Sequence, residues 1–165
     1  MTARRLILVR HAKSLQDGGP DLGRALSHRG ERQAPLLGRR LAQEGVPDRV
    51  LVSPARRAQQ TWQLARPALP EAPEPEVEDR IYDNTVEDLV AVVNDAPSEV
   101  TTLVLVGHNP SMEQLVLTVH DAAGEPDAPV REFPTSALAG FGTDAAWADV
   151  SLDDLRLEWV WSPSG

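Results

Sequence analysis

Three short, largely aliphatic runs recur along the chain, at residues 6–9, 49–52 and 102–106. Apolar runs of this length, without alternating polar positions, are typical of strands buried on both faces of a parallel sheet. Each run ends abruptly at polar or cationic residues. We therefore predict three central strands, each followed by a segment that can carry chemistry.

Apolar positions at helical spacing follow each of these strands. Four capping signals predict where the helices begin: Ser27, Ser53-Pro54, Asn84 or Thr85, and Asn109-Pro110. In the second and fourth signals a polar N-cap residue precedes a proline at the first helical position. The predicted helices cover residues 28–45, 55–66 and 86–96, and a fourth begins at Pro110.

The alternation of strands and helices predicts an α/β fold, with a mostly parallel, open sheet and helices on both faces. Segments 136–141 and 155–161 are expected to complete the sheet, and a short strand is expected near Val77. The loop at 121–134 is long enough to suggest function, but a plain surface connection is an equal alternative. The whole chain, 1–165, is predicted to form one domain.

Composition limits the possible functions. The 16 Lys and Arg residues against 25 Asp and Glu give a formal net charge of −9, which repels nucleic acid. The absence of cysteine excludes disulfides, thiolate catalysis and cysteine-ligated zinc. No apolar run approaches the roughly 20 residues of a membrane span, and the one behind the basic start is too short for a signal peptide. We expect a cytoplasmic protein without membrane contact.

Cationic and imidazole side chains follow all three aliphatic strands. Arg10 and His11 end the first, Arg57 comes shortly after the second, and His108 follows the third. Because the carboxyl ends of parallel strands meet at one edge of a sheet, these side chains are expected to share a pocket. Two helices are predicted to begin there, and their free N–H groups favour an anion.

That set of groups suits a phosphoryl group. Guanidinium forks bind phosphate oxygens in pairs and stabilise the charge that develops during transfer. His11 fits as the nucleophile, because the neighbouring arginine charges lower its pKa and keep its ring neutral. His108 is predicted to donate a hydrogen bond to the phosphoryl group from the other side.

The motifs resemble those of the histidine phosphatase superfamily, which has the phosphoglycerate-mutase-like fold. Arg10-His11-Ala12 resembles its Arg-His-Gly signature, with alanine for glycine. Its second and third motifs are matched by Ser53-Pro54 with Arg57-Ala58 and Thr61, and by Gly107-His108-Asn109-Pro110. The Arg24…Leu26…Arg29-Gly30 segment and Thr135-Ser136-Ala137 resemble in particular the bacterial phosphohistidine phosphatase branch.

The resemblance implies a phosphatase that forms a phosphohistidine intermediate on His11 and needs neither a metal nor another cofactor. It implies that Arg10 and Arg57 bind phosphate and that His108 is the second histidine of the pocket. Arg24 and Asn109 are further candidates for substrate binding. Arg24 could equally form a salt bridge within its loop.

The general acid is the missing part. Mutase-like members use a glutamate with no clear counterpart here, and the candidates by position are Asp83 and Asp17. A leaving alcohol has a pKa of about 16 and a leaving imidazole one of about 6.5. A phosphohistidine substrate, for which a protein partner is a candidate, therefore needs less help from an acid.

Three alternatives stay open on the sequence: a phosphatase of small phosphomonoesters, a non-catalytic phosphate-binding module, and a mutase. The two intact histidines count against the binding module, because phosphate binding needs no nucleophile. The short chain leaves little room for the segments that cover a mutase substrate.

Overall fold

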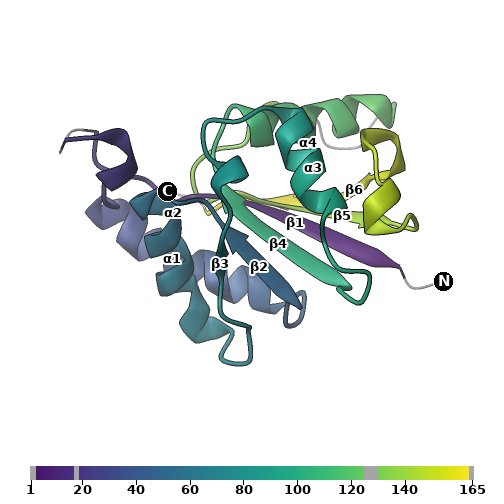
Figure 1. Ribbon diagram of the computed structural model, residues 1–165. Coiled ribbons are helices and arrows are strands. Elements are labelled where there is room, and N and C mark those ends of the chain that lie inside the picture. Colours follow the sequence, from purple (N-terminus) through teal and green to yellow (C-terminus); the bar gives the residue numbers. More distant parts are fainter. Residues whose placement is uncertain (1–2, 17–18, 125–129, 164–165) are drawn as a thin grey trace.

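A six-stranded sheet runs through the centre of the computed structural model, which describes residues 3–16, 19–124 and 130–163 (Figure 1). The strands are β1 (Arg4–Arg10), β2 (Arg49–Val52), β3 (Glu76–Val77), β4 (Thr102–Gly107), β5 (Leu138–Thr143) and β6 (Arg156–Trp161). The α-helices are α1 (His28–Ala42), α2 (Arg56–Ala65), α3 (Val86–Asn94) and α4 (Ser111–Ala122). Short 3₁₀ turns at Asp21–Gly23 and Asp79–Ile81 lie near the carboxyl ends of the central strands.

The strand order is β3-β2-β4-β1-β5-β6. β1 to β4 pair in parallel, while β5 is antiparallel to both of its neighbours. The predicted α/β fold with a mostly parallel sheet is therefore confirmed. The central pair, β4 and β1, brings the residues after Gly107 and Arg10 side by side.

The two largest cores of the described residues lie on opposite faces of the sheet, because successive side chains of each strand point to opposite faces. On β1, Leu6 and Leu8 pack in the cluster that includes α3 and α4, whereas Ile7 and Val9 pack in the cluster that includes α1 and α2. Figure 1 shows the two helix pairs on opposite sides of the sheet. Each buried aliphatic side chain contributes about 1.5–3 kcal/mol, so the aliphatic runs stabilise all three layers.

Two predicted helix caps are confirmed. Ser27 accepts a hydrogen bond from the Gly30 N–H at 3.2 Å, and Thr85 forms a capping box with Asp88. Each cap satisfies N–H groups that the first helical turn leaves unpaired. In the described part of the chain, no helix is long and apolar enough to cross a membrane.

The other two predicted caps are wrong in detail. α2 begins at Arg56 with Ala55 as its N-cap, because the Ser53 hydroxyl instead binds the Ala55 N–H and the ring of His108. α4 begins at Ser111 with Pro110 as its N-cap. The Asn109 side chain still accepts a hydrogen bond from the Glu113 N–H of α4, at 3.2 Å.

The strand near Val77 is confirmed as β3, and the two final strands lie within two residues of their predicted bounds. The loop predicted at 121–134 begins later, because α4 continues to Ala122. Residues 125–129 of that loop lie outside the described residues. Phe133, near its end, is fully buried and belongs to the core on the α3 and α4 side.

Candidate active site

The backbone at His11 is fixed between the central strands. Its N–H donates to the Gly107 carbonyl and its carbonyl accepts from the Ser136 N–H, each at 3.0 Å. The next residue is fixed by the Ala12 N–H, which donates to the Thr61 hydroxyl at 2.9 Å. These bonds place the end of β1 beside β4, α2 and the start of β5.

α1 also approaches this turn closely. A Cβ atom on Gly30 would lie 2.1 Å from the Lys13 carbonyl oxygen, so only glycine allows this packing. The Ser27 N–H and hydroxyl both donate to the same carbonyl. The first turn of α1 therefore supports the segment that follows His11.

The His11 ring has a defined tautomer. It is 7% exposed, and its Nδ1 lies 2.7 Å from the Ala12 carbonyl oxygen. A carbonyl oxygen only accepts, so Nδ1 carries the hydrogen. In the neutral ring the lone pair is then on Nε2.

The His108 ring lies beside the His11 ring. The two ring centroids are 5.1 Å apart, with the planes tilted by 56°. The His108 Nε2 is 2.7 Å from the Ser53 hydroxyl, and the Tyr82 ring packs edge-on with a centroid distance of 5.6 Å. The histidines predicted to share a pocket therefore lie together, and Ser53 and Tyr82 hold one of them.

Both histidines are held in the neutral form. Burial, followed by the positive charges of Arg57 and Arg10, lowers the pKa of His108 to about 4. Burial is also the main cause for His11, whose pKa falls to about 3, with further lowering by His108, Arg57 and Arg10. Near pH 7 both rings are therefore uncharged.

Arg57 is buried, and an unpredicted residue binds it. Its Nη1 donates to the Asp21 carbonyl at 2.7 Å and its Nη2 to the Asp21 carboxylate at 3.0 Å. The Arg57 Nε is buried and has no hydrogen-bond partner among the described residues. The guanidinium is thus fixed at its end, while its Nε–H remains an unused hydrogen-bond donor among the described residues.

Arg10, the last residue of β1, is half-buried. Its Nη1 donates to the Phe133 carbonyl at 3.2 Å, and its Nε is a second buried donor without a partner in the described part of the chain. The Phe133 N–H in turn donates to Glu113 at 2.9 Å. These contacts tie Arg10 to the segment before β5 and to α4.

The two further binding candidates have structural contacts. Arg24 donates to the Asp21 carboxylate, the Ser14 hydroxyl and the Leu15 carbonyl, so it makes the loop salt bridge considered above. Asn109 donates to Phe133 and Glu113, and its oxygen accepts from the Glu113 N–H. These contacts occupy both polar ends of the Asn109 side chain.

The candidate acids are less well placed than the histidines. Asp83 adopts a left-handed backbone conformation (φ 49°) and lines a surface cavity of about 290 Å³. The other lining residues are Asp21, Arg57, Tyr82, Asn84, Asn109 and Pro110. No hydrogen bond joins Asp83 to either histidine among the described residues. Asp17 lies outside the described residues.

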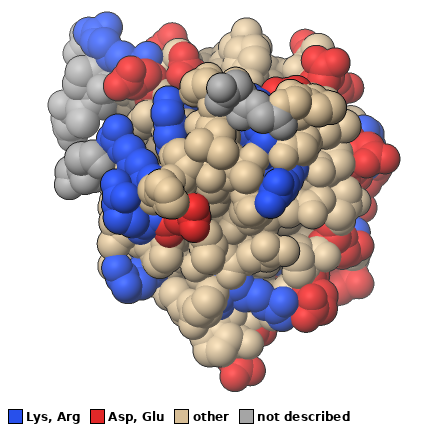
Figure 2. All heavy atoms as spheres, turned by 90° about the vertical axis from the view of Figure 1, so that its left-hand side faces the viewer, with Lys and Arg blue, Asp and Glu red and all other residues tan. Residues whose placement is uncertain are grey.

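The surface around the site is more basic than the net charge of the chain suggests. Figure 2 views the side of the molecule where β1 and β4 end, and Lys and Arg atoms gather in the middle and left of this face. Most Asp and Glu atoms in that view lie toward its margin. An anion that approaches this face would therefore meet positive charge first.

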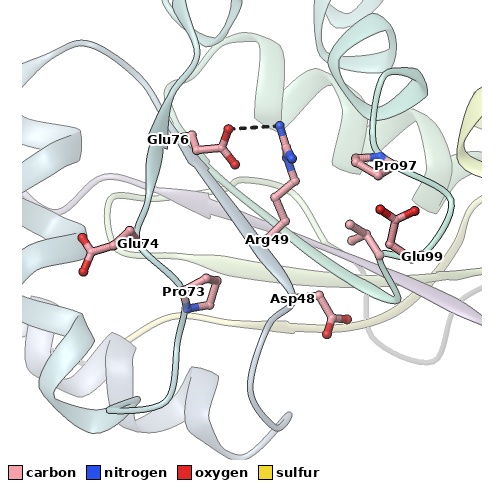
Figure 3. Close-up of a pocket in the computed structure, with 8 residues that line it drawn as sticks. Asp48, Arg49, Pro73, Glu74, Glu76, Pro97 and Glu99 are labelled. Atoms are coloured by element: carbon pink, nitrogen blue, oxygen red, sulfur yellow. Dashed lines mark hydrogen bonds and ion pairs between the residues drawn. The ribbon is translucent and has the colours of Figure 1, made fainter.

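A second surface cavity, of about 340 Å³, lies at the other edge of the sheet, where β2 and β4 begin (Figure 3). Its polar groups have structural partners: Arg49 pairs with Glu76, and the Asp48 carboxylate accepts from the Thr101 and Thr102 N–H groups. Across the described residues, no group of three or more His, Asp or Glu side chains could hold a metal ion.

Comparison with known proteins decides the family. Residues 6–89, which contain Arg10, His11 and Arg57, match the model of the histidine phosphatase superfamily, branch 1. The chain belongs to this superfamily. An uncharacterized protein of Mycobacterium tuberculosis is 39% identical over 149 residues, which cover 86% of this chain and 91% of the relative.

Solved structures confirm the predicted branch. Two proteins, each described as a "putative phosphohistidine phosphatase SixA", share the fold over nearly their whole lengths. The one from Agrobacterium tumefaciens is 30% identical with a TM-score of 0.78, covering 98% of this chain and 99% of its own. The one from Nakamurella multipartitia is 26% identical with a TM-score of 0.82, covering 100% and 99%. Family and branch together support a phosphatase.

Replacing Ser53 with alanine tests the support of His108. The change leaves the His108 Nε2 and the Ala55 N–H without their hydroxyl partner. We expect a loss of about 1–3 kcal/mol in the free energy of unfolding, measured in urea. Ser98→Ala, at an exposed serine, is the matched control, and an equal loss there would contradict a specific role for Ser53.

Proposed function

We propose that this protein is a metal-independent phosphatase that acts through a phosphohistidine intermediate on Nε2 of His11. The observation that carries this proposal is the hydrogen bond between the His11 Nδ1 and the Ala12 carbonyl. It directs the lone pair of a neutral, buried imidazole to Nε2, which is what a nucleophile for phosphorus requires. The lowered pKa of His11 keeps that lone pair free at neutral pH.

Arg10, Arg57 and His108 are the proposed phosphate ligands. The Nε atoms of both arginines and the His108 Nδ1 are buried polar atoms without a protein partner in the described part of the chain. Buried donors are almost always paired, so these atoms suit the oxygens of a bound oxyanion. A SixA structure with 25% identity and a TM-score of 0.78 is a complex with tungstate, which is a tetrahedral oxyanion like phosphate.

The proposed reaction has two steps. The His11 Nε2 attacks phosphorus while the bond to the leaving group breaks, and the arginines stabilise the charge on the equatorial oxygens. His108 donates to one of these oxygens if its hydrogen is on Nδ1, with the Ser53 hydroxyl donating to its Nε2. Water then attacks the phosphohistidine, releasing inorganic phosphate and neutral His11.

Phosphohistidine, on a protein partner, is the proposed substrate. Hydrogen bonds from Tyr82, Arg24 and Arg57 hold the pKa of Asp21 well below its usual range, so Asp21 cannot serve as an acid near neutral pH. Asp83, exposed at the cavity, is the proposed donor of a proton to the leaving group. With so exposed a donor, a leaving imidazole is favoured over a leaving alcohol.

Trapping the phosphorylated protein tests this function. The protein is mixed with a labelled phosphohistidine peptide, quenched and assayed for bound label. We expect a phosphoenzyme that is labile in acid and stable in base, formed equally well after treatment with EDTA. Turnover of the phosphohistidine peptide should exceed that of a phosphoserine peptide.

The other outcomes separate the alternatives. Faster turnover of phosphoserine or sugar phosphates would replace the proposed substrate with a phosphomonoester. Phosphate binding without any phosphoenzyme or turnover would indicate a binding module. Loss of labelling in EDTA that added metal restores would contradict metal independence.

A further inference from the structure

The Asp21 carboxylate accepts four hydrogen bonds at the site, although no sequence motif pointed to it. Its Oδ1 accepts from the Arg24 Nε at 3.2 Å and from the Arg24 Nη2 at 2.8 Å. Its Oδ2 accepts from the Arg57 Nη2 at 3.0 Å and from the Tyr82 hydroxyl. Four donors on one carboxylate occupy the positions that its two oxygens offer.

The contact with Arg57 fixes the orientation of that guanidinium. Nη1 binds the carbonyl of Asp21 and Nη2 its carboxylate, so both terminal nitrogens are held by one residue. The Nε edge of Arg57 is then left buried and without a partner among the described residues. Because the guanidinium is planar, fixing both Nη atoms also fixes the direction of the Nε–H bond. A donor with a fixed direction suits the binding of an oxyanion.

The contact with Tyr82 reaches the second histidine. The Tyr82 hydroxyl binds Asp21, and its ring packs edge-on against His108 with planes at 82°. His108 is therefore held by Ser53 on one side and by the Tyr82 ring on another. Asp21 is thus linked to two proposed phosphate ligands, to Arg57 directly and to His108 through Tyr82.

We propose that Asp21 is a positioning residue for phosphoryl transfer, which orients Arg57 directly and His108 through Tyr82. This inference rests on the proposed function, because it assigns Asp21 to the same phosphate site. The opposite role is that the Asp21 carboxylate competes with phosphate for Arg57. The two roles differ in sign: a positioning carboxylate strengthens phosphate binding, and a competing one weakens it.

Asp21→Asn separates these roles. The amide keeps the size of the side chain but loses its charge-assisted bond to Arg57. We expect the Kd for inorganic phosphate, measured by calorimetry, to rise about tenfold, and kcat to fall by a similar factor. Asp21→Glu, which keeps the charge, should recover part of both losses.

Tyr82→Phe tests the second contact on its own. The phenylalanine keeps a ring against His108 but loses the bond to Asp21, so the expected losses are smaller than those of Asp21→Asn. Glu74→Gln is the matched control, because it removes an exposed carboxylate from an ion pair with Arg66 outside the site. It should change neither Kd nor kcat. Thermal unfolding of each variant shows whether it is folded.

Tighter phosphate binding in Asp21→Asn, or values equal to those of the unchanged protein, would overturn the positioning role. Failure of the proposed function gives a different result. In that case the unchanged protein itself would bind no phosphate and form no phosphoenzyme. If the unchanged protein does both and Asp21→Asn matches it, only the inference about Asp21 fails.

Discussion

His11→Ala is expected to lose phosphatase turnover by about 10⁴-fold or more and to form no phosphoenzyme. The reason is chemical: the remaining groups can bind and polarise a phosphoryl group, but Nε2 of His11 is the proposed site of the new bond. His108 does not substitute, because its Nε2 is held by the Ser53 hydroxyl. Single-turnover assays with labelled phosphohistidine peptide measure both losses.

Phosphate binding should survive this substitution. Arg10 and Arg57 are held by Phe133 and Asp21, and none of these contacts involves His11. We therefore expect the Kd for inorganic phosphate to stay within about threefold, which corresponds to less than about 0.7 kcal/mol. His28→Ala, at an exposed histidine of α1, is the control and should retain full turnover. A labelled phosphoenzyme in His11→Ala would show that another residue is the nucleophile.

The fold could be predicted because its central strands are buried on both faces. In β1 and β4 every interior position must be apolar, since successive side chains enter different cores. The unbroken runs thus identified the parallel strands and, with them, the edge where ligands bind. Arg10, His11, Arg57 and His108 could be assigned to one pocket because each follows such a strand in sequence.

Residues that reach the site from loops could not be found in this way. Asp21 begins a short 3₁₀ turn between Pro20 and Arg24, and its bonds to Arg57 and Tyr82 span 36 and 61 positions. Glu113 likewise meets Phe133 across a loop, which hydrophobic patterning does not predict. Aspartate is common in turns, so the local sequence at Asp21 indicates only a turn. Its bonds to Arg57 and Tyr82 are visible only in the tertiary structure.

Ser53 shows a different reason for error. A serine before a proline is a standard helix start, but capping competes with other partners for the same hydroxyl. Here that hydroxyl binds the His108 ring and the Ala55 N–H, and the helix begins three residues later at Arg56. The sequence signal correctly indicated a helix start near Ser53. The long-range contact with His108 takes the Ser53 hydroxyl, so Ser53 is not the N-cap.

The free energy of unfolding is expected to fall steeply as the pH drops from 6.5 to 4.5. In the folded protein the pKa values of His11 and His108 are lowered to about 3 and about 4, whereas an unfolded histidine titrates near 6.5. In this window the unfolded chain binds protons at both positions and the folded protein binds almost none. The stability that the two neutral histidines provide is thus present above pH 6.5, and about 4 kcal/mol of it is lost between pH 6.5 and 4.5.

Urea unfolding at several pH values measures this slope, in buffers without phosphate because phosphate would stabilise the folded protein. His108→Gln should reduce the slope by about half, since one of the two histidines that cause it is gone. His28→Gln, at the exposed ring on α1, should leave the two-histidine slope in place. A stability that stays constant from pH 6.5 to 4.5 would mean that the folded protein takes up these protons, and the neutral nucleophile proposed for His11 would then be wrong.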